Sequence, residues 1–170
     1  MRPTGGRKIA FETVKPQWKM VIREMAKRRF QAVSIYRRKR DGTVIVQTMA
    51  RHPIGASASF GDPTEIGPPD FDRCIVGTVL DALEKYHKQK FDPALAKRFS
   101  DEEYAQFVRG HDAVDVTLYE DNRVVTVVPC FPRDGGAASR KGYTISFGED
   151  EIGEKLPEAL RAAFSALEKG

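Results

Sequence analysis

An alternating run of residues with a sharp turn in its middle constrains the fold more than any other part of this 170-residue chain. Apolar residues alternate with polar ones over 114–118, residues 120–122 can reverse the chain, and valines return over 124–128. A two-residue period is typical of a β-strand with one buried face. The sequence therefore predicts an antiparallel hairpin here. A third short strand over 143–147 and a helical pattern follow it.

An earlier part of the chain shows the same order of elements. Apolar residues predict strands over 32–36 and 44–49. Asp41 and Gly42 stand between them. Asp-Gly is favoured in two-residue hairpin turns, because both central positions of the turn need positive φ. A second hairpin is therefore expected in the N-terminal half.

Two short sequence matches accompany this similarity. The tripeptide Ser-Phe-Gly begins at Ser59 and again at Ser146, and each copy precedes a Glu-Ile-Gly segment. Two explanations are open. The chain contains a two-fold internal repeat of hairpin, loop and helix, with halves 32–90 and 113–170, or the match arises by chance.

Helical periodicity is strongest over residues 71–86. A carboxylate at Asp70 or Asp72 can accept hydrogen bonds from the free N–H groups of the first turn. We expect the principal core helix here, with one apolar face at helical spacing: Phe71, Ile75, Val76, Val79, Leu80, Leu83 and Tyr86.

Two further helices are expected. A capping-box sequence at residues 100–103 predicts a helix over 101–108. Apolar residues over 156–167 predict a C-terminal helix. It should begin near Lys155, because Pro157 is tolerated only in a first turn, unless Asp150 starts an earlier turn that kinks.

The remaining segments are rich in glycine, proline and small polar residues. Residues 52–69 are expected to form a long surface loop with at most one short strand near 57–60. Residues 132–142 are expected to be a flexible connector, because they lack the spacing of a phosphate-binding loop. The expected fold is a single α+β domain over 9–170, mainly an antiparallel sheet with flanking helices, behind a flexible basic tail at residues 1–8.

Charge is divided unevenly along the chain. Residues 1–51 contain 14 Lys and Arg against 3 Asp and Glu, a net charge of +11. Residues 52–170 contain 14 against 21, a net charge of −7. Such a division bears on partners and association rates rather than on the fold.

The basic part supports one interpretation, nucleic-acid binding. Apolar residues over 16–30 predict an amphipathic helix with basic outer faces, and four cations are expected at an exposed hairpin tip. On this interpretation, cations within residues 15–40 would contact phosphate: Arg28, Arg29, Arg37, Arg38, Lys39 and Arg40. The alternative is a solvated helix face over a buried stripe.

No catalytic or metal-binding motif stands out in the sequence. The histidines are scattered, and His111 beside Asp112 is a common loop pairing. Cys74 and Cys130 lack metal-ligand or CxxC spacing and are expected to be small buried hydrophobes in a reduced compartment. No apolar run is long enough for a membrane span or a signal core. We therefore expect a cytoplasmic protein with no enzymatic activity, no metal and no cofactor.

Several features of the C-terminal half occur together: the hairpin over 114–128, the Gly-rich loop at Gly135, the strand over 143–147 and the segment Glu-Ile-Gly-Glu-Lys-Leu at 151–156. With these features, residues 70–170 resemble the immunity proteins of bacterial contact-dependent growth-inhibition systems. The resemblance implies a cytoplasmic protein without catalytic residues. Such a protein binds and neutralises a cognate toxin domain, usually a nuclease.

An inhibitor of a cationic nuclease needs an acidic surface, and the second part of the chain supplies carboxylates in two groups. The expected partner-binding residues are Asp62, Glu65, Asp70 and Asp72 around one loop and Asp112, Asp115, Glu120 and Asp121 along the hairpin. Complementary charge would speed association and select the partner. The alternative is a set of ordinary solvated carboxylates, and the basic first 51 residues depart from what such an inhibitor needs.

Overall fold

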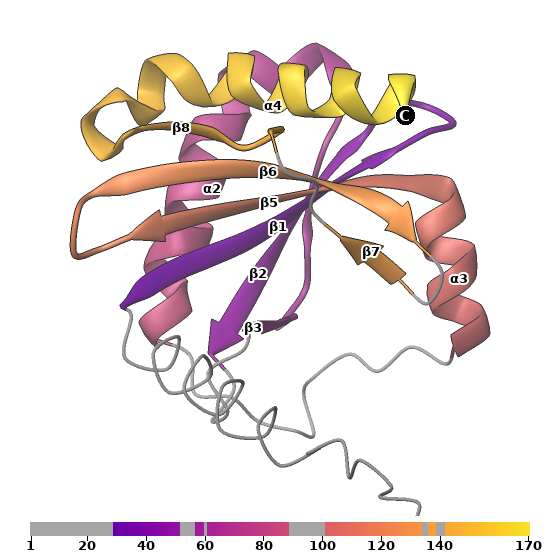
Figure 1. Ribbon diagram of the computed structural model, residues 1–170, viewed down its shortest axis with the longest axis horizontal. Coiled ribbons are helices and arrows are strands. Elements are labelled where there is room, and N and C mark those ends of the chain that lie inside the picture. The colour runs from indigo at the N-terminus through magenta and orange to yellow at the C-terminus, as the bar shows by residue number, and fades with distance from the viewer. Residues whose placement is uncertain (1–28, 52–56, 60, 89–100, 134–135, 139–141) are drawn as a thin grey trace, which may run out of the picture.

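The computed structural model describes residues 29–51, 57–59, 61–88, 101–133, 136–138 and 142–170. These residues form one open antiparallel sheet with helices packed on it (Figure 1). The expected fold class, a single α+β domain with a mainly antiparallel sheet and flanking helices, is confirmed.

The elements follow one another in a simple order. They are β1 (Phe30–Arg38), β2 (Val44–Arg51), β3 (Ser57–Ser59), β4 (Thr64–Ile66), the 3-10 helix η2 (Pro68–Asp70), α2 (Phe71–Lys88), α3 (Asp101–Gly110), β5 (His111–Tyr119), β6 (Val124–Arg133), β7 (Gly136–Ala138), β8 (Ile145–Gly148), the 3-10 helix η3 (Glu149–Glu151) and α4 (Ile152–Lys169).

Two hairpins meet at the centre of the sheet. β1 pairs with β2 in the first hairpin, and β5 pairs with β6 in the second. β1 and β5 join the hairpins along their whole length, from Phe30 opposite Tyr119 to Arg38 opposite His111. The strand order is β3-β2-β1-β5-β6-β7, so the two strands with the clearest alternation lie in the middle.

Four short strands extend the outer strands of the hairpins. β3 and β4 both pair with β2, and β7 and β8 both pair with β6. The sequence prediction was wrong at two of them, because residues 52–69 hold two strands rather than at most one and the expected connector 132–142 contains β7. Strands of three residues are too short to show a two-residue period.

Helices α2 and α4 cover one face of the sheet, and the core lies between them and the strands (Figure 1). Fully buried side chains of both layers fill this space: Val33, Ile35, Val114, Val116, Val125 and Val127 from the strands, and Ile75, Val79, Leu83, Leu156 and Leu160 from the helices. Each large aliphatic side chain removed from water contributes roughly 1.5–3 kcal/mol.

Helix α3 packs on the opposite face. Ile35 points into the core, so its neighbour Tyr36 points to the other side of the sheet. There the Tyr36 ring meets Phe107 of α3 edge to face, with the ring centroids 4.9 Å apart. Phe107 stacks on His111 at 4.1 Å, and Nδ1 of His111 lies 2.9 Å from the Phe107 carbonyl oxygen. These contacts extend α3 to Gly110, beyond the predicted end at residue 108.

One residue of the predicted core helix face is not in the core. Leu80 is 42% exposed, whereas Val79 and Leu83 are buried. Successive helix residues are about 100° apart, and a helix on a sheet buries only part of its circumference. Leu80 therefore falls outside the buried stripe that Val79 and Leu83 occupy.

Two helix boundaries differ from the predictions. α4 begins at Ile152, earlier than expected, and Pro157 lies inside it. The proline ring removes one N–H, the one that would bond the carbonyl of Gly153, and the helix continues past this loss. Phe30, expected at the end of a helix over 16–30, is the first residue of β1. The rest of that predicted helix and the predicted tail at residues 1–8 lie outside the described residues.

The two halves share their order of elements. Two long strands, two short strands, a 3-10 helix and an α-helix occur in each. The internal repeat itself stays a prediction, because a shared order does not separate a repeat from a chance match. Within the described residues, no helix is both long and apolar enough to cross a membrane.

Two leucines allow the helix packing to be tested. Leu160 is fully buried and Leu80 is 42% exposed. We expect Leu160→Ala to lower the free energy of unfolding by about 2–5 kcal/mol, because it leaves a cavity in the core. Leu80→Ala should cost about 1 kcal/mol or less. Urea unfolding of both variants checks this, and equal losses would contradict the placement of the two side chains.

Candidate functional site

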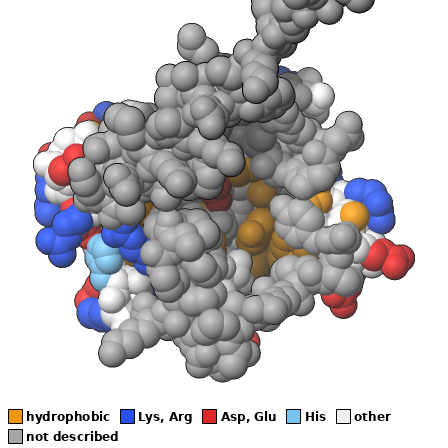
Figure 2. All heavy atoms as spheres, turned by 60° about the horizontal axis from the view of Figure 1, so that its bottom comes forward, with side chains coloured by type: hydrophobic (Ala, Val, Ile, Leu, Met, Phe, Trp, Pro, Cys, Tyr) orange, Lys and Arg blue, Asp and Glu red, His pale blue; other side chains and the backbone are white. Residues whose placement is uncertain are grey.

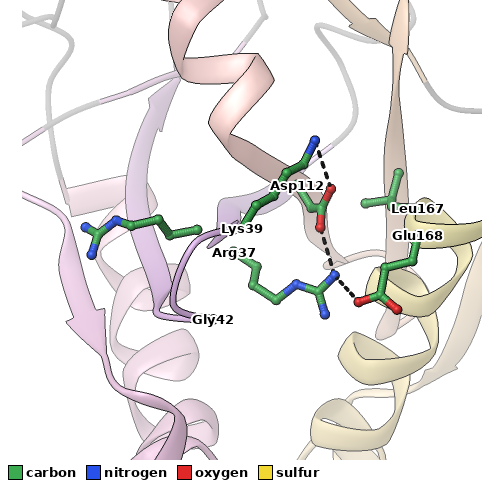
Figure 3. Close-up of a pocket in the computed structure, with 7 residues that line it drawn as sticks. Arg37, Lys39, Gly42, Asp112, Leu167 and Glu168 are labelled. Carbon is green, nitrogen blue, oxygen red and sulfur yellow. Dashed lines mark hydrogen bonds and ion pairs between the residues drawn. The ribbon is translucent and has the colours of Figure 1, made fainter.

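A pocket of 470 Å³ lies where the β1–β2 turn, the start of β5 and the end of α4 meet (Figure 3). Three cations and two carboxylates are among the residues that line it: Arg37, Arg38, Lys39, Gly42, Asp112, Leu167 and Glu168. The sheet register explains part of this group, because Arg37 of β1 lies directly opposite Asp112 of β5. We call this group the turn pocket.

Arg37 ties the end of α4 to the sheet. Its Nη2 lies 2.8 Å from Oδ2 of Asp112 and 2.8 Å from Oε1 of Glu168, as the dashed lines in Figure 3 show. Nη2 also donates to the carbonyl oxygen of Phe164 at 3.5 Å, and the guanidinium carbon lies 4.7 Å from the centroid of the Phe164 ring. A cation here also complements the partial negative charge of the helix C-terminus.

Asp41 organises the turn itself. Its carboxylate accepts a hydrogen bond from the backbone N–H of Thr43 at 3.0 Å and lies 3.3 Å from nitrogens of both Arg38 and Arg40. The bond from Thr43, supported by the two arginines, holds the pKa of this carboxyl well below its usual range. Arg38 also pairs with Glu65 of β4 at 2.6 Å.

The four consecutive cations at 37–40 are therefore not an unpaired positive patch at the tip of the hairpin. All four cations were expected to be exposed, but the side chains of Arg37 and Arg38 are only 22% and 20% exposed, because both residues belong to β1. Lys39 and Arg40 are 48% and 78% exposed. Each of the four lies within ion-pair distance of a carboxylate of the same chain.

The other cations of the nucleic-acid interpretation give little support to it. Arg29 pairs with Glu120 at 3.4 Å, and Arg28 lies outside the described residues. Figure 2 shows Lys and Arg side chains near Asp and Glu side chains at both edges of the face it views. Phosphate would have to compete with these carboxylates, and nucleic-acid binding by residues 15–40 stays a prediction.

The loop carboxylates are mostly engaged as well. Besides Glu65, Asp70 pairs with Arg73 at 2.5 Å, and Asp72 pairs with Arg161 of α4. Asp62 is exposed, and the structure gives it no ion pair among the described residues. Within this predicted set, Asp62 is thus the carboxylate that a partner reaches without breaking an ion pair to another described residue.

The four hairpin carboxylates do not form one patch. Asp112 lies at the start of β5, and Asp121 lies in the turn after its end. At about 3.3 Å per residue, roughly 30 Å of strand separates the two. Asp121 is exposed and accepts the N–H of Asn122 at 3.1 Å.

Asp115 lies in the middle of β5 on the face opposite α2 and α4. Ser34 Oγ donates to its Oδ1 at 2.8 Å, and Cys130 Sγ lies 3.4 Å from its Oδ2. Burial, and then the charge of Asp115, raise the pKa of the Cys130 thiol to about 12. A thiol that stays protonated is a poor nucleophile, so this group does not supply a reactive cysteine.

Glu120 closes the end of α2 against the β5–β6 turn. It contacts His87, accepts a hydrogen bond from Gln31 at 3.2 Å and pairs with Arg29. Burial alone would raise the pKa of Glu120, but the hydrogen bonds from His87 and Gln31 outweigh it, and the pKa is lowered. His87 is exposed and has this acidic neighbour.

Sequence reasoning missed a row of carboxylates. Asp150 of η3 and Glu154 and Glu158 of α4 are all exposed, and Asp150 also lines a pocket of 370 Å³ with Arg123 and Glu149. Their spacing of four residues was the signal, because such residues share one helix face. In the described part of the chain, no group of three or more His, Cys, Asp or Glu side chains is arranged to hold a metal ion.

The thiol pKa predicts slow chemistry at Cys130. In a Cys74→Ala background, alkylation of the folded protein by iodoacetamide at pH 8 should be at least ~100-fold slower than in the urea-unfolded chain. The thiolate fraction falls about tenfold for each unit by which the pKa rises. Asp115→Asn should raise the folded-state rate, because it removes the adjacent negative charge. Equal alkylation rates in the folded and unfolded chains would show that the Cys130 thiol is not buried beside Asp115.

No protein-family model matches the sequence, and no curated protein matches it. Solved structures with the same fold exist. A protein of unknown function from Neisseria meningitidis has a TM-score of 0.61 and 16% sequence identity, over 82% of this chain and 96% of that one. A chain of the CdiA-CT/CdiI toxin and immunity complex from Yersinia pseudotuberculosis has a TM-score of 0.57 and 14% identity, over 81% of this chain and 97% of that one. At these identities the likeness is one of fold, and it extends over most of the domain.

Proposed function

We propose that this protein is a non-catalytic immunity protein that binds a toxin domain and neutralises it. The observation that carries the proposal is the fold shared with a chain of a toxin and immunity complex over 81% of this chain. The sequence resemblance to immunity proteins supports the same function. In this role the protein works through the shape and charge of its surface, performs no reaction and acts in the cytoplasm beside its toxin.

We place the toxin contact at the surface around the β1–β2 turn. This surface combines exposed charges of both signs, with Lys39 and Arg40 in the turn and Glu65 on the neighbouring strand β4, where it pairs with Arg38. Asp62 lies farther along beside β2, where Gly61 accepts a hydrogen bond from Gln47. Exposed ion pairs contribute only about 0–1 kcal/mol each, so exchanging them for pairs with a partner costs little. A mixed pattern of this kind selects partners, because a mismatched toxin would place like charges opposite each other.

Co-expression tests the function directly. An immunity role implies that a large secreted protein is encoded immediately upstream of this chain, and its C-terminal domain is the toxin to use. Expression of that domain alone should arrest growth, and co-expression with this protein should restore it. The two proteins should also co-elute in size-exclusion chromatography. Continued growth arrest without complex formation would contradict an immunity role.

Charge reversal tests the surface. Asp62→Lys combined with Glu65→Lys should slow association with the toxin domain by about tenfold at low salt, and high salt should reduce the difference. Asp81→Lys is the matched control, because Asp81 is an exposed carboxylate of α2 outside this surface. Stopped-flow association rates measure the effect, and thermal melts verify that both variants are folded. Equal rates for the double variant and the control would refute this surface.

A further inference from the structure

The turn pocket contains hydrogen-bond donors for which the described residues supply no acceptor. Within the described part of the chain, the contacts of the Arg37 guanidinium to oxygen all pass through one nitrogen, Nη2. Among the described residues, the structure gives Nε and Nη1 no hydrogen-bond partner. Figure 3 shows the guanidinium between Asp112 and Glu168, with its other terminal nitrogen directed away from Asp112. A guanidinium presents its donors in a planar fork that matches a carboxylate.

Lys39 adds a second cation with spare donors. Its Nζ lies 3.8 Å from Oδ1 of Asp112, within ion-pair distance but beyond a hydrogen bond. Its side chain is 48% exposed on the rim of the pocket. Leu167 supplies an apolar wall, and the volume of 470 Å³ is ample for a side chain from another molecule.

The two carboxylates of the turn pocket differ in how firmly they are held. Asp112 is 11% exposed and is fixed in β5 opposite Arg37. Glu168 is 60% exposed and belongs to the last turn of α4. The Arg37–Glu168 pair is therefore the weaker of the two, and its glutamate can leave without uncovering a buried charge. Once Glu168 leaves, Arg37 and Lys39 share the single carboxylate of Asp112, while Arg38 stays paired with Asp41 and Glu65.

We propose that the turn pocket receives a carboxylate of the protein partner, an Asp or Glu side chain, which takes the place of Glu168 at Arg37. The identity of the ligand as part of a protein rests on the proposed function. In this arrangement Glu168 acts as an internal stand-in for the partner's carboxylate. Because the incoming carboxylate must fit one fork at one position, the pocket fixes the orientation in which the partner binds.

Small anions and conservative variants test the pocket without a partner. Glutarate is titrated into the protein, and the Nε–H resonance of Arg37, identified by its loss in Arg37→Lys, is followed by NMR. We expect saturable binding in the wild type. Glu168→Gln should bind glutarate about two- to fivefold more tightly, because the competing carboxylate is gone, and Lys39→Gln should bind it about two- to fivefold more weakly.

Arg40→Gln is the matched control. Arg40 lies in the same turn and is 78% exposed, but it does not line the pocket, so its loss should leave the glutarate affinity unchanged. Weaker binding to Glu168→Gln, or no shift of Arg37 in any variant, would overturn the proposal. Inorganic phosphate at matched ionic strength is a second arm. Tighter binding of phosphate than of glutarate would identify a phosphate site instead and would equally overturn the proposal.

The toxin domain provides the final arm. Glu168→Gln should lower the dissociation constant of the complex about two- to fivefold, whereas Glu158→Gln, which removes an exposed carboxylate of α4 away from the turn pocket, should not. If no toxin domain binds the wild type, the proposed function fails while the glutarate titration still decides whether the pocket recognises carboxylates. If the toxin binds but none of the pocket variants alters its affinity, the pocket proposal alone fails.

Discussion

The pairing of β1 with β5 is the contact on which the rest of the domain depends. It joins two hairpins that are each complete in themselves, and it sets which side chains face α2 and α4. Val33 opposite Val116 falls on the core face, and Ser34 opposite Asp115 falls on the other. A register slip of one residue would exchange the two faces and bury the Asp115 carboxylate in the core. The hydrophobic alternation of both strands therefore specifies one register.

The same pairing brings together the two oppositely charged parts of the sequence. Cations of the basic first part meet carboxylates of the acidic remainder, as in Arg37 with Asp112. The pairing of β4 with β2 adds a second contact of this kind, Arg38 with Glu65. The oppositely charged parts of the chain thus form ion pairs within the domain as well as charges on its surface. A partner at this surface has to exchange existing ion pairs, which favours selectivity over raw affinity.

Sequence patterns predicted the elements whose structure depends on residues close together in the chain. The hairpins and α2 were found because alternation and helical spacing are visible within a few residues. The turn pocket was not found, since Arg37 and Glu168 are far apart in sequence and meet only through the packing of α4 on the sheet. The carboxylates were recognised as a group, but their partners within the chain could not be read from spacing. Leu80 was misplaced because the width of a buried helix face depends on its neighbours.

The central pairing also has a consequence for synthesis of the chain. Strand β1 ends at Arg38, and its partner is completed only at Tyr119. While the ribosome makes the intervening segment, the inner edge of β1 exposes unpaired backbone groups, a template for unwanted strand addition. The N-terminal hairpin therefore has one unpaired edge until the second hairpin has been made. Pairing of β5 with β1 then covers this edge and removes the site of aggregation.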